Sequence, residues 1–200
     1  MTTRGRPRTF DRDAVLRAAM QLFQAHGYEG TSMADLTAAM GIPAPSLYNA
    51  FGNKEGLFKE TVQYYVTHDG SATARALREQ PTARKAIEIM LREALGPVAS
   101  KTKTHGCLVV LGATNCAEEH REVDDFLKGL RQGNYEAVHQ RLRKAQTEKE
   151  LSNTVDTAAL ASFYATLMNG LAIQMRDGVP RAVLEKVVET AMAAWPDQAG

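Results

Sequence analysis

Residues 32–58 read SMADLTAAMGIPAPSLYNAFGNKEGLF, a segment with two apolar patterns separated by one glycine and two prolines. In the first pattern apolar residues recur at steps of three and four, the spacing of one buried helical face; they are Met33, Leu36, Ala39 and Met40. Gly41 follows, and it predicts a helix end because the residue just past a helix often needs positive φ. The segment therefore begins with a helix and a tight turn.

The second pattern is short. Pro43 and Pro45 suit the approach to a helix and its first turn. Asn53 can then cap a further helix that begins at Lys54. A helix of barely two turns is not stable by itself in water, so it must be held by neighbours on both sides. This is the arrangement of a helix-turn-helix, which offers its second helix to a DNA groove. The short helix has an apolar face of Leu47, Ala50 and Phe51.

An ordered set of residues within 10–60 resembles the DNA-binding domain of the TetR/AcrR family of bacterial transcriptional repressors. The resemblance implies an all-α fold, with a helix-turn-helix three-helix domain followed by a helical regulatory and dimerisation domain. The matching residues are Phe23, Gly27, Tyr28, Thr31, Ser32, Leu36, Gly41, Ile42, Leu47, Tyr48, Phe51, Lys54, Glu55, Leu57 and Phe58.

The whole chain has helical periodicity and no strand-like alternation or internal repeat, so we expect an all-α protein in two parts. The arm and helix-turn-helix domain should occupy residues 1–50, and the ligand-binding and dimerisation domain residues 51–200. A glycine and a proline in residues 69–82 predict a break between elements. Outside residues 32–53, helices are predicted over 11–26, 54–68, 83–98, 106–117, 118–148, 156–176 and 181–195.

The net charge of +1 and the isoelectric point near 7.8 do not indicate a nucleic-acid partner by themselves. The charge is uneven, however, because Arg4, Arg6 and Arg8 precede Asp11 with no acidic residue among them. Next to a helix-turn-helix, such an arm is expected to reach phosphates or an adjacent minor groove. The alternative is a disordered terminus without a role.

Several classes of protein are disfavoured by the sequence. No apolar run reaches the ~18 residues of a membrane span, and the N-terminus is not a signal peptide. The chain also lacks a nucleophile elbow, a phosphate-binding glycine loop, a zinc-protease motif and paired catalytic carboxylates. We therefore expect a soluble cytoplasmic protein that is not an enzyme and uses no cofactor and no metal.

The resemblance implies a DNA-binding site in the arm and the helix-turn-helix. Tyr48 and Lys54 resemble phosphate-contacting positions, which set the register on the duplex. Of the groove-facing side chains only Ser46 and Asn49 can hydrogen-bond to base edges, so we expect modest direct readout. The complete set is Arg4, Arg6, Arg8, Thr31, Ser32, Ala44, Pro45, Ser46, Tyr48, Asn49 and Lys54.

Two cysteines and two histidines follow the pattern H-x-C-x8-C-x3-H at 105–120. In one continuous helix, Cys107 and Cys116 are about 13–14 Å apart on opposite faces, which excludes a disulfide between them and a shared metal. A break at Gly112 would allow both again. Buried packing of the thiols, electrophile sensing by one thiol, and metal binding with His105 or His120 therefore remain open.

The resemblance also implies an effector cavity and a two-fold interface in the second part. For Tyr64, Tyr65 and His68, core packing is an equally good interpretation. The candidate cavity residues are Tyr64, Tyr65, His68, Met90, Cys107, Val110, Leu111, Thr114, Phe126, Phe163 and Leu167. The last two helices are apolar on more than one face, which requires a further partner. The candidate interface residues are Leu160, Leu167, Leu171, Met175, Val183, Val187, Val188, Ala191 and Trp195.

The sequence thus predicts a homodimeric, ligand-responsive transcriptional regulator, a repressor rather than an activator, released from a double-stranded DNA operator by a small molecule. Its partners would be the operator, the effector and a second copy, and no membrane. One alternative is a repressor that senses thiols or electrophiles through Cys107 or Cys116. Two others are a thiol enzyme using one of these cysteines and a helical protein-interaction module that does not bind DNA. The interaction module remains an alternative because few groove-facing side chains of the short helix can hydrogen-bond to bases.

Overall fold

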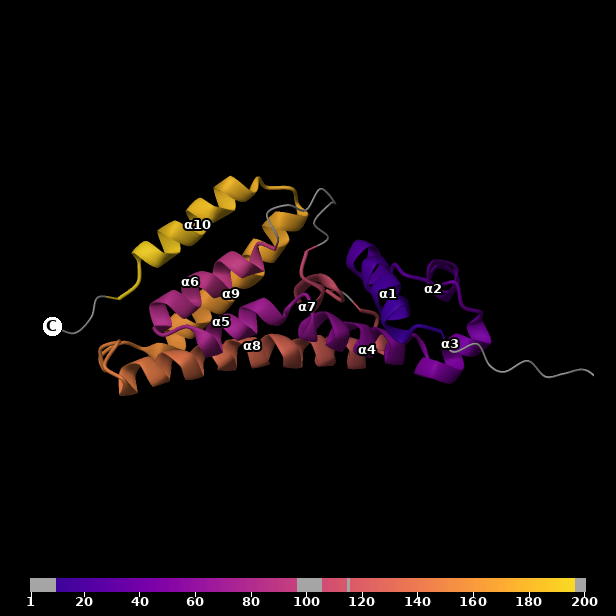
Figure 1. Cartoon of the computed structure of the whole chain (residues 1–200), viewed down its shortest axis with the longest axis horizontal. Helices are drawn as coiled ribbons and strands as arrows, with labels where there is room; N and C mark the ends of the chain where they lie inside the picture. Colours follow the sequence, from indigo (N-terminus) through magenta and orange to yellow (C-terminus); the bar gives the residue numbers. More distant parts are fainter. Residues whose placement is uncertain (1–9, 97–105, 115, 197–200) are drawn as a thin grey trace, which may run out of the picture.

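The computed structural model describes residues 10–96, 106–114 and 116–196, and over these ranges its regular structure is helical (Figure 1), which confirms the all-α prediction. Over the same ranges no helix is long and apolar enough to cross a membrane. The helices are α1 (Arg12–His26), α2 (Met33–Met40), α3 (Ala44–Phe51), α4 (Lys54–Thr67), α5 (Ser71–Glu79), α6 (Ala83–Ala94), α7 (Leu108–Leu111), α8 (Arg121–Thr147), α9 (Thr157–Arg176) and α10 (Arg181–Ala193).

The first helices begin and end where the sequence predicts. The Asp11 carboxylate accepts hydrogen bonds from the backbone N–H groups of Asp13 and Ala14, so it caps α1. Ser32 and Asp35 form a reciprocal capping box at the start of α2. Gly41 ends α2 with φ of 63°, a conformation that a side chain would disfavour. These local signals fix the tight turn that separates α2 from α3.

Two large apolar clusters form most of the core, beside a small third one of Ala83, Ala145 and Leu151. The first joins α1 to α4 with α7 and the beginning of α8, and the second joins α5, α6, α9 and α10 with the rest of α8. Figure 1 shows α8 running beneath α4 and α5 toward the far end of the molecule. Since α4 packs with α1, the cores do not separate cleanly at residue 50, and the predicted boundary between 1–50 and 51–200 stays a prediction.

The predicted break at 69–82 is wrong, because α5 occupies most of it. Gly70 and Pro81 lie outside the two ends of this helix and do not interrupt it. Between them, Ala76 and Leu77 are buried in the second cluster. An alanine-rich sequence with high helix propensity and two buried residues is enough to form the helix.

The predicted helix at 106–117 is also wrong, since α7 ends at Leu111. The carbonyl of Gly112 accepts a hydrogen bond from the backbone N–H of Tyr28 at 2.7 Å, which ties this segment to the turn after α1. A Cβ at Gly112 would clash with the Leu108 carbonyl oxygen, so this position needs glycine. The prediction that Cys107 and Cys116 point to opposite faces of one helix therefore does not apply.

Candidate DNA-binding surface and effector half

One face of α3 is buried and the other is exposed. Leu47 is fully buried and Phe51 is 8% exposed, both in the first cluster. On the opposite face Pro45, Tyr48 and Asn49 are exposed, and Tyr48 keeps 48% of its surface accessible. The structure thus presents α3 as a helix available to a groove. Which of its side chains contact DNA stays a prediction.

Residues Thr31 and Ser32 at the start of α2 differ in their availability. Ser32 is exposed, and its hydroxyl is hydrogen-bonded to Asp35. Thr31 is 1% exposed, and its hydroxyl donates to the Gly27 carbonyl at 2.7 Å. The Thr31 hydroxyl is therefore not free to bond a phosphate in this conformation, and a part of Thr31 in DNA binding stays a prediction.

Lys54 lies against an aromatic ring in this structure. Its Nζ is 4.3 Å from the centroid of the Tyr28 ring, a cation–π contact. Burial lowers the pKa of Lys54, while the nearby Glu29 carboxylate acts in the opposite direction. The predicted phosphate contact requires the ammonium to turn from the ring toward DNA.

The described part of the DNA-binding domain, residues 10–61, has four basic and six acidic side chains, a net charge of −2 without histidine. Three of the four cations have partners: Arg12 pairs with Glu60, Lys59 with Glu55, and Lys54 lies over Tyr28. Only Arg17 is exposed without a hydrogen bond or ion pair within these ranges; the arm of Arg4, Arg6 and Arg8 lies outside the described residues. The folded domain by itself offers DNA little positive charge.

The residues predicted to line an effector cavity lie on different elements of the fold. Met90 is buried in the second cluster, against which Leu167 packs, while Val110 is buried on α7. Phe163 is 47% exposed. These placements divide the set between different parts of the fold, and a pocket built from it stays a prediction. His68 and Thr114 are exposed and Leu111 is half-buried, whereas four residues each pack against the first cluster: Tyr64, Tyr65, Cys107 and Phe126.

Tyr65 and Cys107 form the most specific contact in that group. The Tyr65 hydroxyl lies within hydrogen-bonding reach of the Cys107 thiol and the Leu108 backbone, and burial raises its pKa. Both cysteines are free thiols and half-buried. Burial also raises the pKa of Cys116, and the carboxylates of Glu29 and Asp124 raise it further. Within the described ranges no group of three or more histidine, cysteine or acidic residues could hold a metal ion.

The segment after α7 contacts the DNA-binding domain through Glu29. Its carboxylate accepts a hydrogen bond from the Ala117 backbone N–H at 3.0 Å and lies 2.7 Å from His120 Nδ1. These two contacts lower the pKa of Glu29, the His120 contact most strongly. Together with the Tyr28–Gly112 hydrogen bond, they connect the turn between α1 and α2 to the segment that carries both cysteines.

An exposed apolar strip lies on the last two helices. It consists of Phe163 and Ile173 on α9 and Val183 and Val187 on α10, each at least 37% exposed. A Cβ added at Gly170, between the first two, would meet nothing within 4 Å. Sequence reasoning missed Ile173 and assigned Phe163 to the cavity. The positions 163, 166, 170 and 173 recur at helical spacing and could have revealed this strip.

Part of the predicted interface is wrong. Leu171 is 2% exposed, Val188 fully buried and Ala191 6% exposed, all inside the core of the single chain. Leu160, Leu167 and Trp195 are half-buried against the same core. Val183 and Val187 do face outward, and their role in an interface stays a prediction. The sequence of an apolar stripe does not show which of its residues pack into the chain's own core and which face a partner.

Comparison with known proteins places both halves in one family. Residues 15–61 match the family model described as bacterial regulatory proteins, tetR family, and residues 83–191 match a tetracyclin repressor-like C-terminal domain. The chain is 32% identical over 196 residues to the HTH-type transcriptional repressor ComR of Escherichia coli strain K12, covering 98% of this chain and 93% of that protein. It is 28% identical to the HTH-type transcriptional repressor BdcR of the same strain, covering 87% and 83% of the two chains.

Solved structures agree with this placement. A cysteine variant of the TetR family regulator CifR, complexed with 26 bp double-strand operator DNA, is 43% identical with a TM-score of 0.91, covering 96% of this chain and all of that one. A TetR regulator from Rhodococcus sp. RHA1 is 33% identical with a TM-score of 0.62, covering 94% and 100%. The chain is therefore a helix-turn-helix transcriptional regulator and belongs to the TetR family of bacterial regulatory proteins.

Proposed function

We propose that this protein is a homodimeric cytoplasmic repressor that binds a two-fold symmetric operator and is released from it by a small molecule. The proposal rests on the exposed face of α3, whose opposite face is buried in the core through Leu47 and Phe51. The names of ComR and BdcR as repressors, and the operator complex of CifR, support it. Two copies of α3 enter successive major grooves about 34–36 Å apart.

Selection of bound fragments from genomic DNA by the purified protein tests this function. The proposal expects enrichment of fragments that share a two-fold symmetric motif, with binding that weakens steeply as salt rises. Fragments without a shared motif, or binding that does not respond to salt, would contradict it. Such a result would instead favour a helical interaction module without operator recognition.

Asn49 and Lys54 should differ in how they affect binding. Asn49→Ala removes an exposed amide from α3 and should change preference at particular base pairs, by about 1–3 kcal/mol at each. Lys54→Gln should weaken binding to every sequence. It should also reduce the slope of log K against log salt by the contribution of about one phosphate contact per half-site. Titration of a fragment panel at several salt concentrations checks both. Equal losses on all sequences for Asn49→Ala would show that Asn49 does not read bases.

We further propose that the effector is an electrophile and that the protein senses it through Cys107. The contact between the half-buried Cys107 thiol and the Tyr65 hydroxyl, next to the start of α7, supports this proposal. Cys116 is disfavoured, since its raised pKa keeps it protonated at neutral pH. Addition to an activated C=C bond forms a bond between Sγ and the electrophilic carbon and breaks the C=C π bond. The thiol proton passes to solvent, and the enolate that results takes a proton from solvent. The adduct would displace α7, and the Gly112–Tyr28 hydrogen bond links α7 to the DNA-binding domain.

Alkylation with N-ethylmaleimide should therefore release the selected DNA fragment, and Cys107→Ser should abolish that release. Cys116→Ser serves as the matched control and should keep it. At Cys116 the alkylation rate should be low at pH 7 and rise as pH approaches its raised pKa. Mass spectrometry of each site with parallel DNA titration measures this. Release that persists in Cys107→Ser would show that Cys107 is a packing residue and not the sensor.

A further inference from the structure

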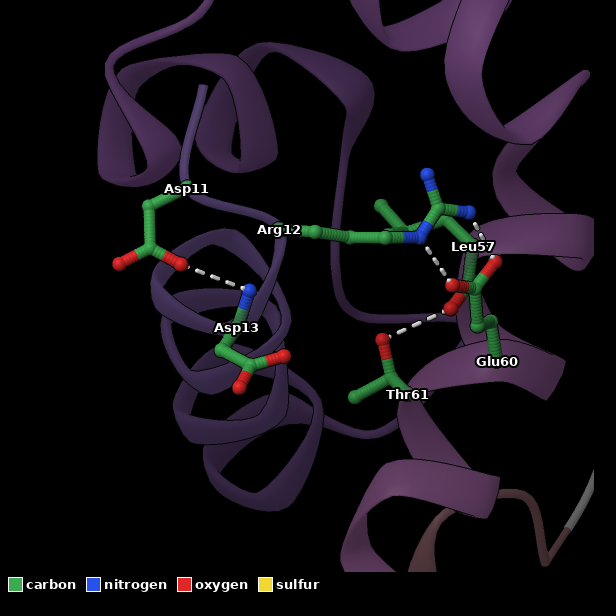
Figure 2. A network of polar contacts seen from close by, with 6 residues as sticks. All are labelled: Asp11, Arg12, Asp13, Leu57, Glu60 and Thr61. Carbon is green, nitrogen blue, oxygen red and sulfur yellow. Dashed lines mark hydrogen bonds and ion pairs between the residues drawn. The ribbon is translucent and has the colours of Figure 1, made fainter. Parts of the chain in front are cut away.

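Arg12 links three helices of the DNA-binding domain, and Figure 2 shows its contact with Glu60. It is the first residue of α1, and its guanidinium donates to the Glu60 carboxylate on α4, from Nε to Oε1 and from Nη2 to Oε2, each at 2.6 Å. The same guanidinium lies 4.5 Å from the centroid of the ring of Phe51, the last residue of α3. One side chain thus connects the beginning of α1 with the end of the recognition helix and with α4.

The geometry of these contacts is directional. Two parallel N–H···O bonds fix the plane of a guanidinium, and its position over a ring restricts it further. Phe51 is 8% exposed and also contacts the ring of Phe10, with centroids 6.3 Å apart. On α4, the Thr61 hydroxyl beside Glu60 donates to the Leu57 carbonyl at 2.7 Å in the buried part of the helix. Since α4 also buries Leu57, Phe58 and Val62 in the first cluster, the carboxylate that holds Arg12 stands on a helix packed into the core.

The pair is not a major source of stability. The side chains of Arg12 and Glu60 are 47% and 36% exposed, and ion pairs at such exposure contribute little to the free energy of unfolding. The competing role for an exposed arginine beside the arm is a phosphate contact. In this structure, however, Glu60 already occupies two of the donors that a phosphate would need.

We infer that Arg12 is a positioning residue for DNA recognition, which sets the orientation of α3 relative to α4 through Glu60 and Phe51. The inference rests on the proposed operator binding. It adds two residues, Arg12 and Glu60, that were not among the expected DNA contacts. The two parallel N–H donors and the planar group that lies over the ring are specific to arginine, so lysine at position 12 keeps the charge but not the geometry.

The test compares Arg12→Lys and Glu60→Gln with the wild type, and with Arg17→Lys as matched control. Arg17 lies on the same helix, is exposed, and has no hydrogen bond or ion pair within the described ranges. Each protein is titrated with the selected genomic fragment and with a scrambled duplex of equal length, at several salt concentrations. Circular dichroism melting verifies the fold.

Both Arg12→Lys and Glu60→Gln should weaken binding to the selected fragment about fivefold to tenfold, as the loss of a base contact does. Binding to the scrambled duplex and the salt slope should not change, and Arg17→Lys should behave as wild type. If Glu60→Gln tightens binding to both duplexes with a steeper slope, Arg12 is a phosphate ligand and the inference is wrong. Unchanged affinities in both variants would also overturn it, while failure of the wild type to select any fragment would overturn the proposed function itself.

Discussion

Replacing Arg4, Arg6 and Arg8 together by glutamine should weaken operator binding at physiological salt by at least about 100-fold. The reason is the charge of the folded domain, which is −2 over residues 10–61, with most of its cations already paired. The arm adds three positive charges per protomer, and therefore six per dimer. Each phosphate that is neutralised contributes about 0.9 to the slope of log K against log salt.

The measurement is a titration of the selected fragment at several salt concentrations. The slope for the triple variant should be smaller by several units, and binding to scrambled DNA should fall by a similar factor. Arg17→Gln, which removes one exposed and unpaired charge from α1, is the control and should have a small effect. A triple variant with an unchanged slope would show that the arm does not reach the DNA.

Val183→Glu should convert the dimer to monomers and reduce operator binding below detection. Val183 is 49% exposed on the strip of α9 and α10, so the single chain tolerates a carboxylate there. In a two-fold interface the same substitution occurs twice and is buried without a partner, at a cost of several kcal/mol. A monomer offers one recognition helix and half of the phosphate contacts, which is too little for specific binding at physiological salt.

Sedimentation equilibrium with circular dichroism checks this prediction. Ala137→Glu, which adds the same charge at an exposed position of α8, is the control and should remain dimeric. Leu171→Glu should instead lower the melting temperature sharply, because Leu171 is in the core of the single chain. A dimer that persists in Val183→Glu would place the interface elsewhere.

Sequence reasoning was most successful where local chemistry determines the structure. Asp11 and Ser32 cap the first two helices close to their predicted starts, and Gly41 ends α2 as expected. It failed where tertiary packing overrides a local signal. α5 forms because Ala76 and Leu77 are buried, and α7 stops because the Gly112 carbonyl bonds to Tyr28, 84 positions earlier in the chain. Neither contact can be read from periodicity.

The candidate sites show the same contrast between local signals and tertiary contacts. The exposed face of α3 follows from a short apolar pattern, since Leu47 and Phe51 determine which side is buried. The pairing of Arg12 with Glu60, 48 residues away, has no signal in the sequence. The same holds for Leu171 and Val183, which are equally apolar in the sequence, although the fold buries one and exposes the other.

Footprinting of the selected genomic fragment tests the central claim, that α3 reads DNA as part of a dimer. We expect two protected major-groove segments, centred 10–10.5 bp apart and related by two-fold symmetry. In Asn49→Ala both segments should lose protection at the same symmetry-related bases. A single protected segment, protection confined to the minor groove, or a footprint that Asn49→Ala leaves unchanged at every base would contradict it.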